Sequence, residues 1–307
     1  MEGQTGGLIA AASSSAAFPL MKLGAIPVIK RIVLSFQQAG ISPIVVVTGV
    51  QEESVKCELA DYGVIFLHNP HYERPPLLES VQIGLNYLRG KCGRVIFTPV
   101  NVPLFSPETL LKLMESDGEI VTPSYRHHGG HPILLAAGVF EKILDYCGPD
   151  GLRGAIAGMG ERRRWVEVDD PGILHSVHDR ESLEQSLESH NRAISHPFVR
   201  VSIERESSFF NARAKLLLLL ISETHSVREA CGRMALSYSN AWKMLNTLEE
   251  ALGYPVVLRR HGGKKGGRTE LTERGRRFLE TYEHFEKLVR AYAQEQFIRL
   301  FQDTGLL

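Results

Sequence analysis

Short, continuously apolar runs alternate with segments of helical period through the first half of the chain. The apolar runs lie at residues 7–12, 43–49, 64–68 and 94–100. Apolar residues three and four positions apart predict helices at 26–38, 52–60 and 78–89. Such alternation is typical of a parallel sheet with both faces covered. We therefore predict an α/β, Rossmann-like fold with a mostly parallel sheet, helices on both faces, and a ligand site at the carboxyl ends of the strands.

Beyond residue 120 the pattern becomes less regular. Further strands are predicted at 120–122, 131–135 and 165–168, followed by a polar helix at 180–189. A polar stretch punctuated by Pro197 comes next. We expect a first domain over 1–190, a linker over 191–199, and a second domain over 200–290 whose last helix runs to about 301.

The second domain opens with two predicted helices joined by a short turn at 235–237. The first helix begins at 226–230, and the second spans 238–252. Ser237 stands where a cap is needed, because its hydroxyl can accept a bond from a free amide of the first helical turn. One face of the second helix is apolar: Ala241, Leu245, Leu248 and Leu252. The other face is polar and can reach base edges or phosphates: Ser239, Asn240, Lys243 and Asn246. This arrangement is the helix-turn-helix pattern.

A basic, glycine-rich loop follows the second helix. It lies between strand signals at 256–258 and 269–271, with five cations and four glycines but no acidic residue over 259–268. Cations of this kind neutralise phosphates and release counterions. The alternative is a solvated loop that is merely basic, but its position directly after a helix-turn-helix favours a DNA-binding wing.

These segments resemble the DNA-binding domain of molybdate-responsive regulators, the ModE family. The resemblance rests on residues 237–242, 249–258, 262–267 and 271–275. It implies a winged-helix domain that contacts double-stranded DNA through Ser237, Tyr238, Ser239, Asn240, Lys243, Arg259, Arg260, Lys264, Lys265 and Arg268. Ala235 departs from the family, which has glycine there, and a left-handed backbone would cost alanine roughly 1 kcal/mol.

The last predicted helix carries an aromatic and apolar seam. Phe278, Tyr282, Phe285, Val289 and Tyr292 alternate by four and three residues. That spacing resembles a dimer contact, and a two-fold dimer suits the reading of paired half-sites. We expect a homodimer; the alternative is that the seam packs on its own domain.

Composition narrows the class of protein. The formal net charge is zero, so affinity for nucleic acid must come from a local patch. Four widely spaced cysteines suggest reduced core thiols in the cytoplasm: Cys57, Cys92, Cys147 and Cys231. The apolar run 216–221 is far shorter than the ~20 residues of a membrane span. We see no signal peptide and expect no membrane association.

The first domain resembles the MobA/MocA-like molybdenum-cofactor nucleotidyltransferases over most of residues 7–183. The matching segments are 9–12, 19–24, 45–49, 69–70, 80–85, 98–103, 130–132 and 168–174. The resemblance implies the nucleotide-diphospho-sugar transferase type of fold, a CTP or GTP substrate, Mg²⁺ and a molybdopterin ligand. The implied nucleotide contacts are Ala10, Ala11, Ala12, Ser13, Lys22, Thr48, Ser80 and Asn101. Lys22 and Asn101 hold the catalytic positions, Asn101 the metal position, and His131 lines the pocket.

Several of the chemical groups that the family uses are missing. The first loop, 12–18, has neither the glycine nor the arginine that cradle the triphosphate. Asn101 replaces an aspartate, and residues 176–178 (Ser-Val-His) replace a D-x-D element. Mg²⁺ prefers charged oxygen ligands, so we expect very low transfer activity. Mg²⁺ and CTP or GTP are expected as cofactors only if the first domain is active. Two groups offer an alternative metal site, although loop histidines are usually solvated: His175, His178 and Asp179, and His127, His128 and His131.

Three functional hypotheses follow from these patterns. The first is a DNA-binding regulator tied to molybdenum metabolism, whose degenerate nucleotidyltransferase-like domain senses a ligand or binds a partner. The second is an active cytidylyl- or guanylyltransferase fused to a regulatory DNA-binding domain. The third is a winged helix that binds protein instead of DNA, which is hard to reconcile with the basic wing.

Overall fold

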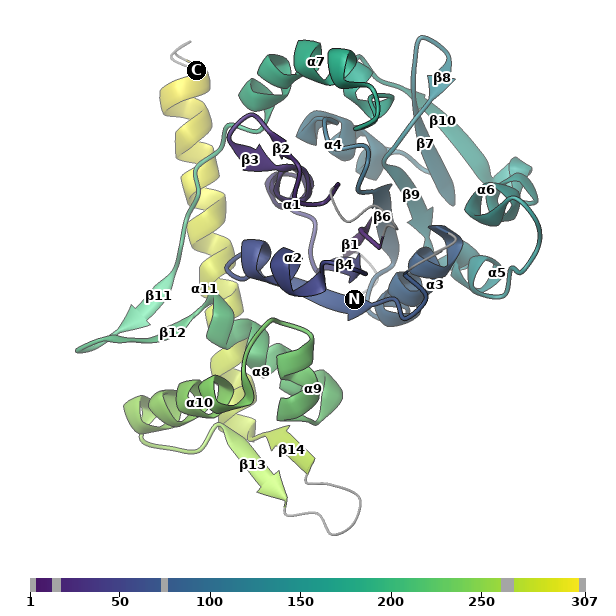
Figure 1. The fold of residues 1–307 in the computed structure, drawn as a ribbon. Helices are drawn as coiled ribbons and strands as arrows, with labels where there is room; N and C mark the ends of the chain where they lie inside the picture. The colour runs from purple at the N-terminus through teal and green to yellow at the C-terminus, as the bar shows by residue number, and fades with distance from the viewer. Residues whose placement is uncertain (1–3, 13–17, 73–76, 261–267, 304–307) are drawn as a thin grey trace. The chain divides into compact units, whose positions relative to one another are not determined.

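The computed structural model describes residues 4–12, 18–72, 77–260 and 268–303 (Figure 1). The chain divides into two compact units. Unit 1 is Met1–Leu59 with Val64–Ser195, and unit 2 is Ala60–Gly63 with His196–Leu307. Helix α7 continues to Ala193, which is three residues into the stretch predicted as the linker.

An eight-stranded mixed sheet forms the centre of unit 1. Its order is β10-β7-β9-β6-β1-β4-β5, with β8 beside β7. The strands are β1 Thr5–Ala10, β4 Ile44–Thr48, β5 Val64–His68, β6 Arg94–Pro99, β7 Ile120–Tyr125, β8 His128–Gly129, β9 Ile133–Ala136 and β10 Arg163–Glu167. The mostly parallel sheet is confirmed, but β9 runs antiparallel to both β6 and β7. A buried apolar run does not reveal strand direction.

Helices cover both faces of this sheet. They are α1 Val28–Gln38, α2 Glu52–Leu59, α3 Leu77–Leu88, α4 Pro107–Glu115, α5 Phe140–Leu144, α6 Gly151–Ala157 and α7 Arg180–Ala193. Short 3₁₀ turns lie at Ala137–Val139, Gly160–Arg162 and Pro171–Ile173. Successive β1 residues show the two faces, because Gly7 lies against Phe36 of α1 and Leu8 lies against Gly84 of α3. A small hairpin pairs β2 (Lys22–Leu23) with β3 (Ile26–Pro27).

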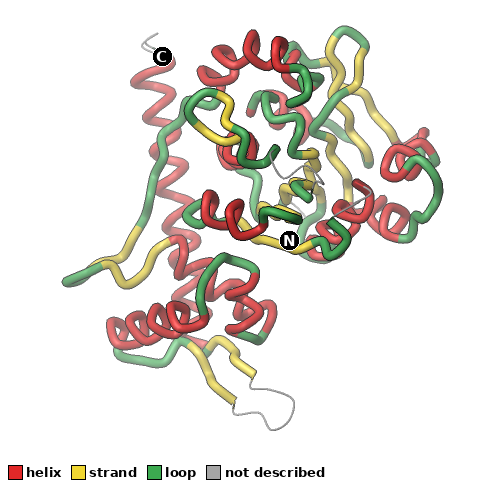
Figure 2. The backbone as a smooth tube through the Cα atoms, viewed as in Figure 1, coloured by secondary structure: helices red, strands yellow, loops and turns green. Residues whose placement is uncertain are grey.

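Unit 2 is helical, with two small hairpins (Figure 2). Its elements are β11 Ser202–Glu204, β12 Ser208–Asn211, α8 Ala212–Thr224, α9 Val227–Gly232, α10 Tyr238–Leu252, β13 Val257–Arg260, β14 Arg268–Leu271, α11 Glu273–Phe297 and a π-helical turn Ile298–Gln302. The second helix of the helix-turn-helix has the predicted bounds. The pattern did not predict α8, because its apolar run 216–221 has no helical period.

Helix α11 packs on its own unit through only part of its predicted seam. Phe278 and Tyr282 contact Phe210 edge-on, with ring centroids 4.8 and 4.7 Å away. The Tyr282 hydroxyl donates to the Val201 carbonyl at 2.7 Å. Phe285, in contrast, is 50% exposed. Part of the seam thus packs within unit 2, and the dimer contact stays a prediction.

Two remaining expectations concern membranes and thiols. Within the described chain, no helix combines the length and apolarity that crossing a bilayer demands. All four cysteines are free. Cys92 and Cys231 are buried as predicted, but Cys57 and Cys147 are exposed, so the prediction of four core thiols was wrong for these two.

Candidate nucleotide site and nucleic-acid interface

Main-chain hydrogen bonds join the carboxyl end of β1 to β4 and to the residue after β6. The Ala11 amide donates to the Val47 carbonyl at 2.8 Å, and the Ala10 carbonyl accepts from the Val100 amide at 3.0 Å. A side chain on Gly49 would lie only 3.2 Å from the Ala12 backbone. Ala10 and Ala11 are buried with these main-chain groups engaged, whereas Ala12 is half-buried. Ser13 lies outside the described residues.

Thr48, at the end of β4, and Ser80, in α3, are both buried. Each is only 1% exposed. The Thr48 hydroxyl donates to the Leu67 carbonyl at 3.1 Å, and the Ser80 hydroxyl accepts from the buried Asn69 amide at 3.1 Å. Both hydroxyls are engaged in these internal hydrogen bonds, and their contact with a nucleotide stays a prediction.

Lys22 is exposed on β2, and a buried arginine holds the hairpin that carries it. The Arg31 Nε donates to the Leu23 carbonyl at 3.0 Å, and its guanidinium also donates to Asn191 of α7 at 2.7 Å. Arg31 is 1% exposed, and burial lowers its pKa. The sequence analysis missed Arg31, because one cation on an amphipathic helix gives no signal of burial.

The residues around Asn101 do not fit Mg²⁺. The Asn101 side-chain NH₂ donates to the Ser176 hydroxyl at 3.5 Å, and the Asn101 main-chain carbonyl accepts from the Val177 amide at 2.8 Å. The side-chain oxygen is buried without a hydrogen-bond partner among the described residues. One neutral oxygen supplies none of the charge that Mg²⁺ requires beside phosphates. A ligand that donates a hydrogen bond would satisfy this oxygen better.

Neither of the proposed alternative metal sites forms. In the part of the chain that the structure describes, no three His, Cys, Asp or Glu side chains are placed to hold a metal. The His175 ring meets the Ser186 hydroxyl at 2.9 Å, and the His178 ring packs on Phe18. Asp170 is fully used as a local cap: it accepts from the Ser106 and Gly172 amides at 2.7 and 2.9 Å.

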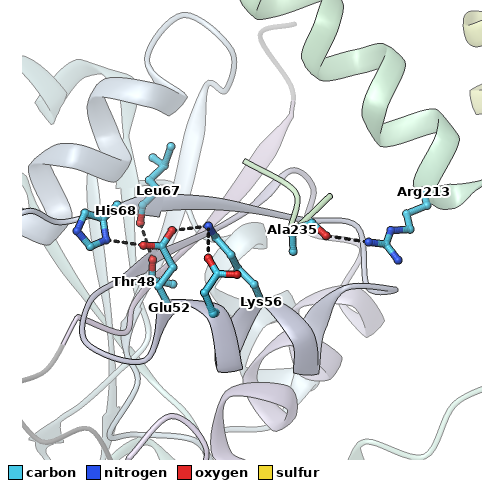
Figure 3. A network of polar contacts seen from close by, with 8 residues as sticks. Thr48, Glu52, Lys56, Leu67, His68, Arg213 and Ala235 are labelled. Carbon is cyan, nitrogen blue, oxygen red and sulfur yellow. Dashed lines mark hydrogen bonds and ion pairs between the residues drawn. The ribbon is translucent and has the colours of Figure 1, made fainter. Parts of the chain in front are cut away.

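A network of charged side chains links helix α2 to the edge strand β5. The two Glu52 carboxylate oxygens bind Lys56 Nζ and His68 Nδ1, each at 2.6 Å (Figure 3). Lys56 also reaches Glu53 at 3.3 Å and is largely buried. Because both Glu52 oxygens are occupied, this carboxylate offers no free ligand to a cation.

Arg163 of β10 is a partly buried cation that the sequence pattern did not reveal. Arg163 stacks on the Trp165 ring, 3.9 Å from its centroid, and donates to the Thr122 hydroxyl at 3.0 Å. Burial and then the nearby Arg153 lower the pKa of Arg163. Burial and then Arg163 lower the pKa of His131 to about 4. Arg163 is therefore a partly buried cation, whereas Arg153 is exposed and His131 is neutral at physiological pH.

The helix-turn-helix has the geometry its sequence predicts. Ser226 caps α9, accepting from the Glu229 amide at 3.3 Å, and Ser237 caps α10, accepting from the Asn240 amide at 3.3 Å. Ala235 adopts the expected left-handed backbone, with φ 52°. The carbonyl of Ala235 accepts from the Arg213 guanidinium at 2.8 Å, which fixes the turn to α8.

The predicted DNA contacts divide by position. Five of the predicted contacts at the N-terminal end of α10 are exposed: Ser237, Tyr238, Ser239, Asn240 and Lys243. Strands β13 and β14 pair antiparallel, and Arg268 is exposed. Arg259 lies against Trp242, 4.2 Å from its ring centroid. Lys264 and Lys265 lie outside the described residues, as does the side chain of Arg260.

Comparison with known families separates the two units in the same way. Residues 18–165 match the MobA-like NTP transferase domain. Residues 214–276 match the bacterial regulatory helix-turn-helix protein family of the lysR type. The chain therefore carries both a nucleotidyltransferase-like region and a helix-turn-helix region.

Curated relatives match only part of the chain. The molybdenum transport protein ModE of Azotobacter vinelandii is 34% identical over 89 residues, covering 29% of this chain and 33% of the relative. The transcriptional regulator ModE of Haemophilus influenzae is 29% identical over 102 residues, covering 33% and 38%. The chain thus spans about a third of the length of these relatives.

Solved structures support the fold of unit 1. A nucleotidyl transferase from Methanothermobacter thermautotroptrophicus superposes with a TM-score of 0.53 at 20% identity, covering 62% of this chain and 98% of that chain. The protein Rv0371c from Mycobacterium tuberculosis gives 0.51 at 18% identity, covering 61% and 100%. At these identities the likeness establishes the fold alone.

Proposed function

We propose that this chain is a DNA-binding transcriptional regulator linked to molybdenum metabolism. The observation that carries the proposal is the capped, exposed recognition helix α10 behind a left-handed turn at Ala235. The partial likeness to ModE proteins supports the link to molybdenum. In this account the N-terminal turn of α10 enters the major groove, and basic residues of the wing bind phosphates.

Unit 1 then serves as a ligand-binding module without nucleotidyl transfer. Lys22 and Arg163 supply positive charge, and the buried side-chain oxygen of Asn101 supplies an unsatisfied acceptor. Nucleotidyl transfer needs a metal to stabilise the developing charge. Because unit 1 lacks the carboxylates that would hold this metal, its site favours binding of a phosphate-containing ligand over transfer. We propose that a nucleotide or a molybdopterin-type ligand occupies this module.

The DNA-binding function is tested by fluorescence anisotropy with a duplex that the wild-type protein selects from a randomised library. Lys243→Glu reverses a charge on an exposed residue of α10 and should weaken binding by about 5- to 150-fold, roughly 1–3 kcal/mol. Lys142→Glu makes the same change on an exposed residue of α5 and should leave affinity unchanged. Equal affinity for both variants would remove α10 from the interface.

A second candidate function is nucleotidyl transfer, which the matching region 18–165 favours. Its test is pyrophosphate release from CTP or GTP with Mg²⁺ and molybdopterin, comparing wild type with Asn101→Asp. Turnover by the wild-type protein would establish the enzyme. Silence from the wild type with detectable nucleotide binding would support the ligand-binding module.

A further inference from the structure

Arg259 has a set of partners that a phosphate-binding arginine lacks. Its guanidinium lies 4.2 Å from the Trp242 ring centroid and donates to the Asn246 side-chain oxygen at 3.0 Å. It also lies 3.7 Å from a carboxylate oxygen of Glu249. All three partners belong to α10, whereas Arg259 belongs to the first wing strand β13.

The same carboxylate fastens the beginning of that strand. Glu249 accepts from the Val256 and Val257 amides at 2.8 and 3.1 Å. Glu249 is half-buried, so its charge is partly shielded from water and is satisfied by these donors. Its interactions with Arg259 and the two amides join α10 to the base of the wing.

Stacking continues along α10 beyond Trp242. Tyr238 packs edge-on against Trp242 at 6.0 Å, and the Arg228 guanidinium of α9 lies 5.6 Å from the Tyr238 ring centroid. A row of cation, ring, ring and cation therefore connects α9, α10 and β13. Each cation–ring contact adds attraction and restricts the side chains that make it.

We propose that Arg259 is a positioning residue that sets the recognition helix against the wing, and that it does not contact phosphate. This inference rests on the proposed DNA-binding function. The Arg259 side chain is 47% exposed and keeps its charge, but its stacking on Trp242 and its hydrogen bond to Asn246 direct the guanidinium toward α10. A guanidinium held in this way would have to leave α10 to reach a phosphate. Its planar fork matches the ring and the amide oxygen together, which a lysine ammonium does not.

The test compares two exchanges at Arg259 with a matched exchange at Arg268. Anisotropy titrations with the library-selected duplex, at several salt concentrations, give affinity and the slope of log affinity against log salt for wild type, Arg259→Gln, Arg259→Lys and Arg268→Gln. A lost phosphate contact lowers the magnitude of the slope by about one. Arg268 is exposed on the paired strand and serves as the phosphate-contacting control. Its ion pair with Glu270, at 2.7 Å, lies within its own strand and does not hold Arg268 on α10.

A positioning role predicts that both Arg259 variants lose affinity, by about tenfold, while keeping the wild-type salt slope. Arg268→Gln should lower the slope. Arg259→Gln with a lowered slope and Arg259→Lys with wild-type affinity would overturn the inference and leave the DNA-binding function intact. A wild-type protein that binds no duplex would overturn the proposed function and the inference with it.

A second measurement needs no DNA. Trp165 and Trp242 are the two tryptophans of the chain, so Trp165→Phe leaves Trp242 as the sole reporter. Acrylamide quenching of Trp242 should increase when Arg259→Gln is added, because the guanidinium no longer covers the ring. Unchanged quenching would show that Arg259 does not rest on α10 in solution and would overturn the inference.

Discussion

Two residues are unusual for their type, Ala235 in its backbone conformation and His190 in its burial and pKa. Ala235 has a left-handed backbone at the turn between α9 and α10. His190 of α7 is 3% exposed, and burial together with Arg31 lowers its pKa to about 3. The cost at Ala235 could be anticipated from the sequence, because related turns use glycine there. Nothing in the polar pattern of 180–189 indicated a buried histidine next to that stretch.

Ala235→Gly should raise the free energy of unfolding of the helix-turn-helix by roughly 1 kcal/mol, because glycine adopts a positive φ without a steric penalty. Thermal and urea unfolding of the full chain measure the change. Ala251→Gly, inside α10, should lower stability by about the same amount. A loss of stability in Ala235→Gly would contradict the assigned turn.

His190 should make unit 1 less stable in acid. Its folded pKa, about 3, is below the unfolded value, so the unfolded state binds more protons between about pH 6.5 and pH 3. Stability is therefore lost as pH falls through this window, by about 2 kcal/mol at pH 5. His190→Asn should remove that part of the pH dependence in urea unfolding. His128→Gln, at an exposed histidine, should retain it.

At the scale of elements, the sequence predicted best where a period was clear. The four apolar strands and three helices predicted in the first hundred residues and all of α10 fell close to their predicted bounds. The β2–β3 hairpin, helix α8 and the β11–β12 hairpin were missed, because a run of leucines has no period and very short strands give little contrast. The burial of the Thr48 and Ser80 hydroxyls, in β4 and α3, was not visible in the sequence, because it arises from tertiary packing.

The packing of α3 on β1 predicts a large effect from one methyl group. A Cβ on Gly84 would lie 2.1 Å from a Leu8 methyl, and both residues are in the core. Gly84→Ala should therefore destabilise unit 1 by roughly 1–3 kcal/mol. Gly232, in helix α9, has open space where its Cβ would lie. Gly232→Ala should be neutral or stabilising by up to ~1 kcal/mol, and equal losses in both variants would contradict the packing.

At the scale of the whole molecule, the two units differ in whether the side chains expected at each predicted site are present. Unit 2 has the caps, the turn and an exposed polar end of α10, whereas the residues around Asn101 in unit 1 lack the charged oxygens for Mg²⁺. Helix α11 adds an exposed apolar stripe: Phe285, Leu288 and Tyr292 are 50%, 56% and 65% exposed. A stripe with this spacing suits a second copy of the same helix.

We expect the wild-type protein to be a dimer by light scattering. Phe285→Glu should shift it to a monomer at the same concentration, because a carboxylate would be buried without a partner in the contact. Leu111→Glu, at an exposed leucine of α4, should leave the dimer intact. A wild-type monomer throughout the micromolar range would contradict a dimer contact through α11.

Selection from a randomised duplex library measures sequence-specific DNA binding through α10. We expect enrichment of an inverted repeat whose half-sites lie about one helical turn apart, as two copies of α10 require. Loss of the enriched sequence with Lys243→Glu would tie the selection to α10. Recovery of the input library without enrichment would contradict sequence-specific DNA binding.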